Sequence, residues 1–328
     1  MRTDKARSST GWRRLLHALI AALGIVTIVG SGGGAFLPDI DLSGPFDLPP
    51  SASITPSRAT VQVGATVSFT VSTVFGKQPF SYQWRRNGVD IIGATGTSYM
   101  LAGANLGDDD ALFEVTVTAS NGVTTAGALL RVSSAPGLVY QDGDFPVSGW
   151  FVTAIVEPLQ NAPTHTESRQ ATGGNPDAFR GIAYQMPQGP SSARIFHAAL
   201  NATYDPALQG AIYTIDLALD CNRLSTSTTS ETLASPTFAQ GGRRFAPQQW
   251  DTGCAPLWQV RHGSSLLANE FVLVDGPPCA AGEACPDFSA NAAPLRFGFV
   301  SGVTLSSDAG AGAITQGIDN WKVTVWRR

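Results

Sequence analysis

The 328-residue chain is poor in charge and above all in lysine. Charged residues make up 14% of the sequence, and the lysines are Lys5, Lys77 and Lys322. The net charge of −4 is unevenly spread, because residues 1–14 contribute +4 and the rest of the chain therefore carries −8. Since neutralisation of phosphates dominates nucleic-acid affinity, this acidic body argues against DNA or RNA as a partner.

Common catalytic motifs are also lacking. The chain beyond residue 35 has His165, His197 and His262, and none lies in a Gly-x-Ser-x-Gly motif. Asp216 and Asp220 face the same side of one expected strand, but about 13 Å separates them, too far for a pair of glycosidase carboxylates. No Walker loop, dinucleotide fingerprint or zinc-ligand spacing is present. We therefore expect a protein that is not an enzyme.

The N-terminus has the layout of a secretory signal peptide, which we assign to residues 1–35. Basic residues through Arg14 precede the apolar run 15–30, which is short for a membrane span of about 20 residues. The alternative is an uncleaved signal anchor, which would be the chain's only contact with a membrane. Ser31 stands where a bacterial lipoprotein carries its lipid-bearing cysteine, so we expect no lipid. Residues 36–50, rich in Gly, Pro and Asp, are expected to form a flexible tether.

Cysteine is scarce and confined to the second half of the chain, at Cys221, Cys254, Cys279 and Cys285. The spacing is not Cys-x-x-Cys and no histidine is nearby, which argues against a metal site. An even number of cysteines after an export signal favours disulfides, for which three pairings can be drawn. Residues 278–286 resemble a small closed loop, so we choose Cys279–Cys285 together with Cys221–Cys254.

Three segments after the tether alternate apolar and polar residues, as half-buried strands do. They are residues 64–71, 80–88 and 109–117. With Trp84 in the second, the pattern resembles the immunoglobulin family's Cys…Trp…Asp-x-Gly/Ala-x-Tyr-x-Cys signature. Phe69 and Val115 stand where that family has its cysteines, and Phe113 replaces its corner tyrosine. The resemblance implies an immunoglobulin-like sandwich over residues 51–134, with an apolar pair against the tryptophan in place of the disulfide.

Short expected strands separated by turn-rich stretches fill residues 138–328. The strands are Trp150–Val156, Ala193–Leu200, Ala211–Leu219, Phe271–Val274, Leu295–Val300 and Trp321–Trp326. Passages at 140–150, 172–179, 211–217 and 317–325 resemble jelly-roll modules of the laminin-B and carbohydrate-binding type. The resemblance implies a larger jelly-roll β-sandwich, so the whole chain is expected to be all-β.

A structural calcium site is one candidate function of this second domain. In jelly rolls of this type the first and last strands pair, which would bring Asp142 and Asp144 near Asp319. Carboxylates suit Ca²⁺, which takes six to eight oxygen ligands. The alternative is that residues 142–144 form a plain turn and that Asp319 caps the approach to a strand. Both interpretations stay open at this point.

A sugar-binding face is the second candidate, because such sites set an aromatic ring against the sugar and bond its hydroxyls with polar side chains. We select Trp250, Trp258, Arg243 and Arg244, which lie in or beside turn-rich stretches. Similar stretches hold Tyr184, Tyr204, Asn201 and Asp251. The alternative is that large aromatic residues belong to the core, which is the interpretation adopted for Trp84, Trp150 and Trp321.

Together these features predict an exported, non-catalytic binding or adhesion protein of the cell envelope or exterior. Its C-terminal jelly roll is expected to recognise a glycan or surface polymer, with structural calcium as the one cofactor considered. The alternatives are an adhesin that binds a surface protein, a structural envelope component and a polysaccharide-degrading enzyme.

Overall fold

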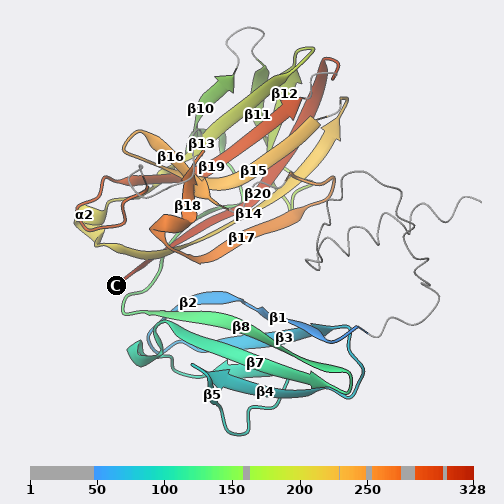
Figure 1. The fold of residues 1–328 in the computed structure, drawn as a ribbon. Helices are drawn as coiled ribbons and strands as arrows, with labels where there is room; N and C mark the ends of the chain where they lie inside the picture. The colour runs from blue at the N-terminus through green and yellow to red at the C-terminus, as the bar shows by residue number, and fades with distance from the viewer. Residues whose placement is uncertain (1–47, 158–162, 229, 249–252, 275–284, 306–308) are drawn as a thin grey trace, which may run out of the picture. The chain divides into compact units, whose positions relative to one another are not determined.

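A computed structural model describes the chain from residue 48 onward, apart from five short segments. Those segments are 158–162, 229, 249–252, 275–284 and 306–308. Strands dominate the described residues and form four sheets in two β-sandwiches (Figure 1). The all-β prediction is confirmed: an immunoglobulin-like sandwich is followed by a larger one. Among the described residues, no helix combines the length and the apolar character needed to cross a membrane.

The first sandwich pairs a three-stranded sheet, β1-β3-β6, with a five-stranded sheet, β2-β8-β7-β4-β5. Their bounds are β1 Ser51–Thr55, β2 Arg58–Gln62, β3 Val67–Val74, β4 Ser81–Arg86, β5 Val89–Asp90, β6 Ser98–Leu101, β7 Ala111–Ala119 and β8 Gly122–Ser133. The three alternating segments of the sequence fall on β3, β4 and β7, as predicted. Strand β2 joins β8 in parallel, whereas β7 and β8 pair antiparallel.

Aromatic rings form the centre of the first sandwich. Trp84, Phe69 and Val115 have no exposed surface. The ring of Phe69 stacks on Phe113 at 5.1 Å between centroids, and Phe113 stacks on Tyr99 at 5.6 Å. The indole N–H of Trp84 donates to the carbonyl of Gly96 at 2.9 Å, so the ring is buried without an unsatisfied donor. This core therefore holds its two sheets together without a cross-link.

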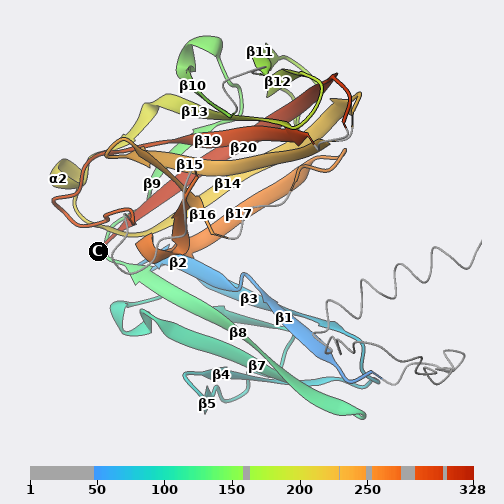
Figure 2. The ribbon, with the colours of Figure 1, turned by 45° about the horizontal axis from the view of Figure 1, so that its top comes forward.

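The larger sandwich packs two six-stranded sheets face to face. One has the order β10-β13-β19-β15-β16-β18 and is called the β19 sheet below. The other has the order β11-β12-β20-β14-β17, with β9 on β20, and is called the β20 sheet. In both views β13, β19 and β15 run side by side, as do β20 and β14 (Figures 1 and 2). The bounds are β9 Leu138–Asp142, β10 Trp150–Glu157, β11 Thr164–Gln170, β12 Phe179–Met186, β13 Ser191–Tyr204, β14 Ile212–Thr226, β15 Ser230–Gln240, β16 Arg243–Pro247, β17 Gln259–Leu266, β18 Phe271–Leu273, β19 Leu295–Leu305 and β20 Gly312–Arg327.

A disulfide links the β20 sheet to the segment before β17. Cys221 of β14 is bonded to Cys254, with 5.7 Å between their Cα atoms, so the predicted pair is confirmed. Cys285 is also disulfide-bonded. Its expected partner, Cys279, lies outside the described residues.

Residues Asp47–Arg328 form one compact unit, in which buried polar side chains join the two sandwiches. The hydroxyl of Thr60 on β2 lies 3.0 Å from the hydroxyl of Thr214 and 2.7 Å from that of Ser265. Arg131 of β8 donates to the carbonyl of Ser265 at 2.7 Å. These hydroxyl groups are buried, so each needs the partner that the other sandwich supplies.

Candidate functional site

The predicted calcium residues lie where β9 meets β20. These first and last strands pair antiparallel, as expected, with Asp142 opposite Trp321. However, one carboxylate oxygen of Asp142 accepts the backbone N–H groups of Asp144 and Phe145, and the other accepts the indole N–H of Trp150 at 2.8 Å. Asp144 forms an ion pair with Arg169. N–H donors and a guanidinium thus engage three of the four carboxylate oxygens of Asp142 and Asp144. The described residues hold no group of three or more His, Cys, Asp or Glu placed to bind a metal.

Asp319 belongs instead to a buried pair of carboxylates with Asp220. Asp319 accepts the backbone N–H of Asn175 at 2.5 Å and that of Asn320 at 2.7 Å. Asp220 accepts the side-chain amides of the same two asparagines, at 2.9 and 2.7 Å. Burial raises the pKa of Asp319, and the charges of Asp220 and Asp177 raise it further, while its hydrogen bonds oppose the shift. The pair anchors the loop Gly173-Gly174-Asn175-Pro176 to the sheet.

Trp258, a predicted sugar platform, holds the same loop. Its indole N–H donates to the carbonyl of Gly173 at 3.0 Å, and its ring lies edge-on to Phe179 at 5.4 Å between centroids. Gly174 of this loop is close to Asp319, since a Cβ there would lie 2.6 Å from the carboxylate oxygen. The half-buried tryptophan therefore has a structural role at this loop.

The other predicted sugar-site residues are dispersed. Trp250 and Asp251 lie outside the described residues. Arg243 and Arg244 lie on β16, where the Arg244 guanidinium stands 5.6 Å above the ring of Phe196. Tyr184 and Tyr204 are fully buried, so neither ring can serve as a platform, and Trp84, Trp150 and Trp321 are buried as predicted.

A serine–histidine contact is present but sealed in the core. Ser301 lies 2.9 Å from the imidazole Nε2 of His197 and 2.6 Å from the hydroxyl of Tyr184, and Arg180 donates to Nδ1 of the histidine at 3.2 Å. Burial lowers the pKa of His197 well below its usual value, and the charge of Arg180 adds to the shift. Ser301, His197 and Tyr184 have no exposed surface, so a substrate cannot reach this chain of side chains.

A groove of about 220 Å³ lies on the outer face of the β19 sheet and is called the sheet groove. Its lining residues are Arg194, Leu233, Ser235, Ala246, Pro247, Gln248, Val272, Leu273, Val274 and Val300. Val300 alternates with the core residues Phe299 and Ser301, so it points outward and packs with Phe196 in a small cluster apart from the main core. Its neighbours two residues away on β19, Gly298 and Gly302, are buried close to the backbone of β13 and do not line the groove.

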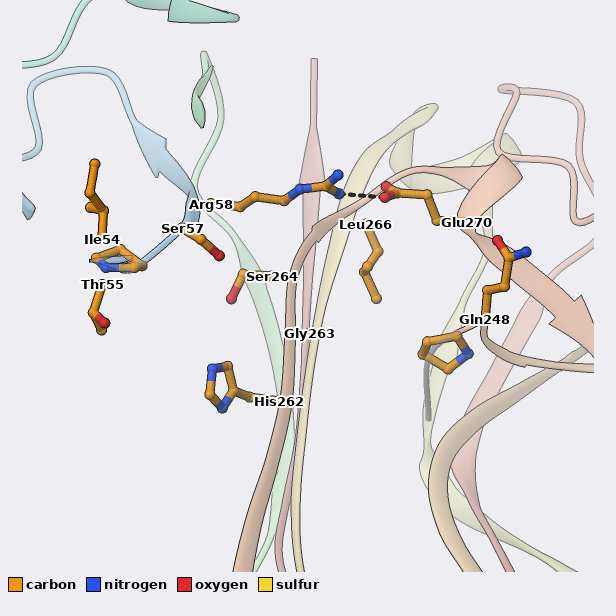
Figure 3. A pocket seen from close by; sticks show the side chains of 12 residues that line it. Ile54, Thr55, Ser57, Arg58, Gln248, His262, Gly263, Ser264, Leu266 and Glu270 are labelled. Carbon is orange, nitrogen blue, oxygen red and sulfur yellow. Dashed lines mark hydrogen bonds and ion pairs between the residues drawn. The ribbon is translucent and has the colours of Figure 1, made fainter. Parts of the chain in front are cut away.

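A larger cleft of about 470 Å³ lies where β1 and β2 approach β17, and is called the junction cleft. The first sandwich contributes Ile54, Thr55, Pro56, Ser57 and Arg58, and the larger one contributes Pro247, Gln248, His262, Gly263, Ser264, Leu266 and Glu270. Figure 3 shows Arg58 reaching Glu270 across the cleft, with His262 and Ser264 projecting from β17 toward the segment of Thr55 and Ser57.

Neither cavity could be found from the sequence. Arg194 and Gln248 lie 54 positions apart in the numbering, and no local motif marks either of them. The junction cleft depends on how the two sandwiches pack against each other. The alternation of apolar and polar residues within a strand carries no information about that packing.

No family model matches the chain, and no curated protein matches it. Among solved structures, the four N-terminal immunoglobulin domains of Dscam1 isoform 6.9 are 24% identical over 26% of this chain and 21% of that chain, with a TM-score of 0.24. A family 30 carbohydrate-binding module of a cellulosomal cellulase of Clostridium thermocellum is 12% identical over 57% of this chain and 96% of that chain, with a TM-score of 0.33. The chain thus spans about a fifth of the Dscam1 structure. TM-scores of this size establish neither a shared family nor a shared ligand.

Proposed function

We propose that this chain is an exported, non-catalytic binding protein that recognises a neutral glycan or surface polymer in the sheet groove. The observation that carries the proposal is the sheet groove itself, in which partly exposed apolar side chains and the exposed polar side chains of Arg194 and Gln248 line one hollow on the outer face of the β19 sheet. Concave sites with an apolar floor and a few polar groups are the usual form of a small-ligand site.

The chemistry of the lining suits a sugar. Val272 and Leu273, which are partly exposed, offer an apolar floor to the C–H face of a sugar ring, while the exposed side chains of Arg194 and Gln248 supply donors and acceptors for hydroxyl groups. The guanidinium of Arg194 is already oriented, because it donates to the carbonyl of Val274 at 2.9 Å. The acidic body of the chain disfavours polyanionic ligands, so a neutral polymer is the better match.

The side chains that line the sheet groove support binding without catalytic turnover. The described lining residues include no carboxylate, histidine or thiol. Hydrolysis of a glycosidic bond requires such groups as acid, base or nucleophile. We therefore expect weak, reversible binding, with single-site dissociation constants of roughly micromolar to millimolar.

Export is supported by the Cys221–Cys254 bond, since disulfides persist in oxidising compartments. A cleaved signal peptide and no lipid are expected at the N-terminus. Mass spectrometry of the mature protein checks this, and an intact Met1 or an acylated terminus would contradict it.

The function is tested by glycan-array screening and calorimetric titration of the mature chain, beside an assay for released oligosaccharide. Arg194→Ala should weaken binding about tenfold, because the variant loses one hydrogen bond from a charged group to the ligand. Arg296→Ala is the matched control, because Arg296 is also exposed on the β19 sheet but does not line the groove. Released product would make the protein an enzyme. If no glycan binds and a purified surface protein does, the protein is better described as an adhesin.

A further inference from the structure

The sheet groove and the junction cleft adjoin each other. Pro247 and Gln248, at the end of β16, line both cavities. The two cavities therefore share a stretch of wall at these two residues. The two cavities differ in construction, because the groove is formed by the larger sandwich alone and the cleft needs both sandwiches.

The charged side chains that line the junction cleft, apart from His262, are one acid and one base. Its acid, Glu270, forms an ion pair with Arg58 through one carboxylate oxygen, and its other oxygen accepts the backbone N–H of Leu267 at 2.9 Å. Both oxygens of this carboxylate are thus engaged within the protein. A charged ligand would have to replace the ion pair, whereas a neutral ligand can enter beside it.

The cleft also offers neutral hydrogen-bonding groups. The side chains of Ser57, Gln248, His262 and Ser264 form no hydrogen bond with another of the residues that the structure describes. Gly263 adds only backbone, on a strand that pairs on one side with β14 and is the last in its sheet. Hydroxyl, amide, imidazole and backbone groups that face one cavity match a ligand with many hydroxyl groups.

Both walls of the cleft are held in place by the buried junction. Ser265 directly follows the cleft-lining residues 262–264 of β17, and Thr60 lies two positions after Arg58 on β2. The hydroxyls of Thr60 and Ser265 are 2.7 Å apart. Arg131 adds a hydrogen bond to the Ser265 carbonyl. Little conformational entropy remains to be lost when a ligand binds between walls fixed in this way.

From these features we infer that the groove and the cleft form one binding path, in which a neutral, hydroxyl-rich chain lies along the groove, passes Gln248 and continues into the junction cleft. This inference rests on the proposed function. It adds that the first sandwich supplies part of the ligand site and that affinity depends on chain length.

The test titrates the mature chain with di- to octasaccharides of the neutral polymer that binds best among β-glucan, xylan, mannan and dextran. Affinity should rise about tenfold once the oligosaccharide is long enough to reach the cleft, because two or three further hydrogen bonds form. Ser57→Trp should remove that gain and leave the affinity for the shortest ligands unchanged. Ser53→Trp is the control, since Ser53 is exposed on β1 but does not line the cleft.

A second pair of variants covers the case in which the tryptophan disturbs folding. His262→Ala removes one side chain of the cleft and should lower only the affinity for long oligosaccharides, by about threefold to tenfold. Val260→Ala is its control, two residues away on the same strand and outside the cleft.

The outcomes separate the two proposals. Binding that is sensitive to Arg194→Ala, yet equal for all chain lengths, would overturn the shared path and leave the proposed function intact. Failure of every neutral oligosaccharide to bind would overturn both. A peptide that competes for the cleft and is blocked by Ser57→Trp would replace the glycan with a protein partner and contradict the inference.

Discussion

The two sandwiches stabilise their interiors in different ways. The first has a core of stacked rings around Trp84, with its one indole donor satisfied by a backbone carbonyl. The larger one encloses a row of polar side chains, in which Arg180, His197, Ser301 and Tyr184 are joined by hydrogen bonds, and it also has a disulfide.

This difference has a consequence for stability. An apolar core gains stability from burial and tolerates changes of shape that conserve volume. A buried polar row is favourable only while each member keeps its partners, so the loss of one leaves the others unsatisfied. The larger sandwich should therefore respond to pH and to oxidation state more strongly than the first.

The largest expected effect tests the apolar core. Trp84→Ala removes a fully buried indole and should destabilise the first sandwich by about 3–5 kcal/mol. Hydrogen exchange of peptides from β7 and β19, followed in denaturant, distinguishes the two sandwiches. Protection should fall first in β7. An equal and simultaneous loss in β19 would show that the junction makes the two sandwiches one cooperative unit.

Removal of the Cys221–Cys254 cross-link should have the next largest effect. Its closed loop has a sequence separation of 33 residues, for which chain entropy gives about 3–4 kcal/mol. The double variant Cys221→Ala/Cys254→Ala should lower the unfolding free energy of the larger sandwich by that amount. Peptides from β3, β4 and β7 are the internal control, since the described part of the first sandwich has no cysteine. Their protection should not change.

A pH effect comes from His197. Its pKa is lowered in the folded state, so the unfolded chain binds the proton first as the pH falls below about 6.5. Stability is then lost on acidification, by at most about 1.4 kcal/mol per pH unit. Asp319 and Asp216 have raised pKa values and act with the opposite sign, gaining stability as they take up protons.

The variant His197→Gln isolates this effect. It should be less stable than the wild type at pH 7, because the imidazole bonds to Ser301 and Arg180 are lost, but its stability should depend less on pH. Denaturant melts of both proteins at several pH values give the comparison. Parallel pH profiles for the two proteins would show that His197 does not titrate as described.

The sequence predicted strands well where one face is apolar. The segments around Phe69, Trp84 and Phe113 alternate cleanly and become β3, β4 and β7. Strand β11 was missed, because Thr164–Gln170 is a polar edge strand with no apolar side to detect. Strand β15 was missed as well, since Pro236 interrupts it, and proline usually argues against a central strand.

The candidate site was harder to predict because side-chain roles depend on distant neighbours. Trp258 is the residue type that sugar platforms use, yet its indole N–H donates a hydrogen bond to the carbonyl of Gly173, 85 positions away. Asp142 and Asp144 are residue types that commonly bind metals, yet a backbone N–H donates to the Asp142 carboxylate and Arg169 forms an ion pair with Asp144. Nothing local distinguishes these uses, because each is decided by which strands the fold brings together.

The smallest expected effect concerns the junction between the sandwiches. Thr60→Val replaces a buried hydroxyl by a methyl group of similar size and leaves Thr214 and Ser265 without their shared partner. The expected cost is about 1 kcal/mol. Thr70→Val on β3 is the control, because Thr70 is exposed and is not one of the three hydroxyl residues of the junction. If the junction couples the sandwiches, Thr60→Val should also separate their unfolding transitions, which hydrogen exchange of β7 and β19 peptides would resolve. Transitions separated no further than in the wild type would mean that the Thr60 hydroxyl does not couple the two sandwiches.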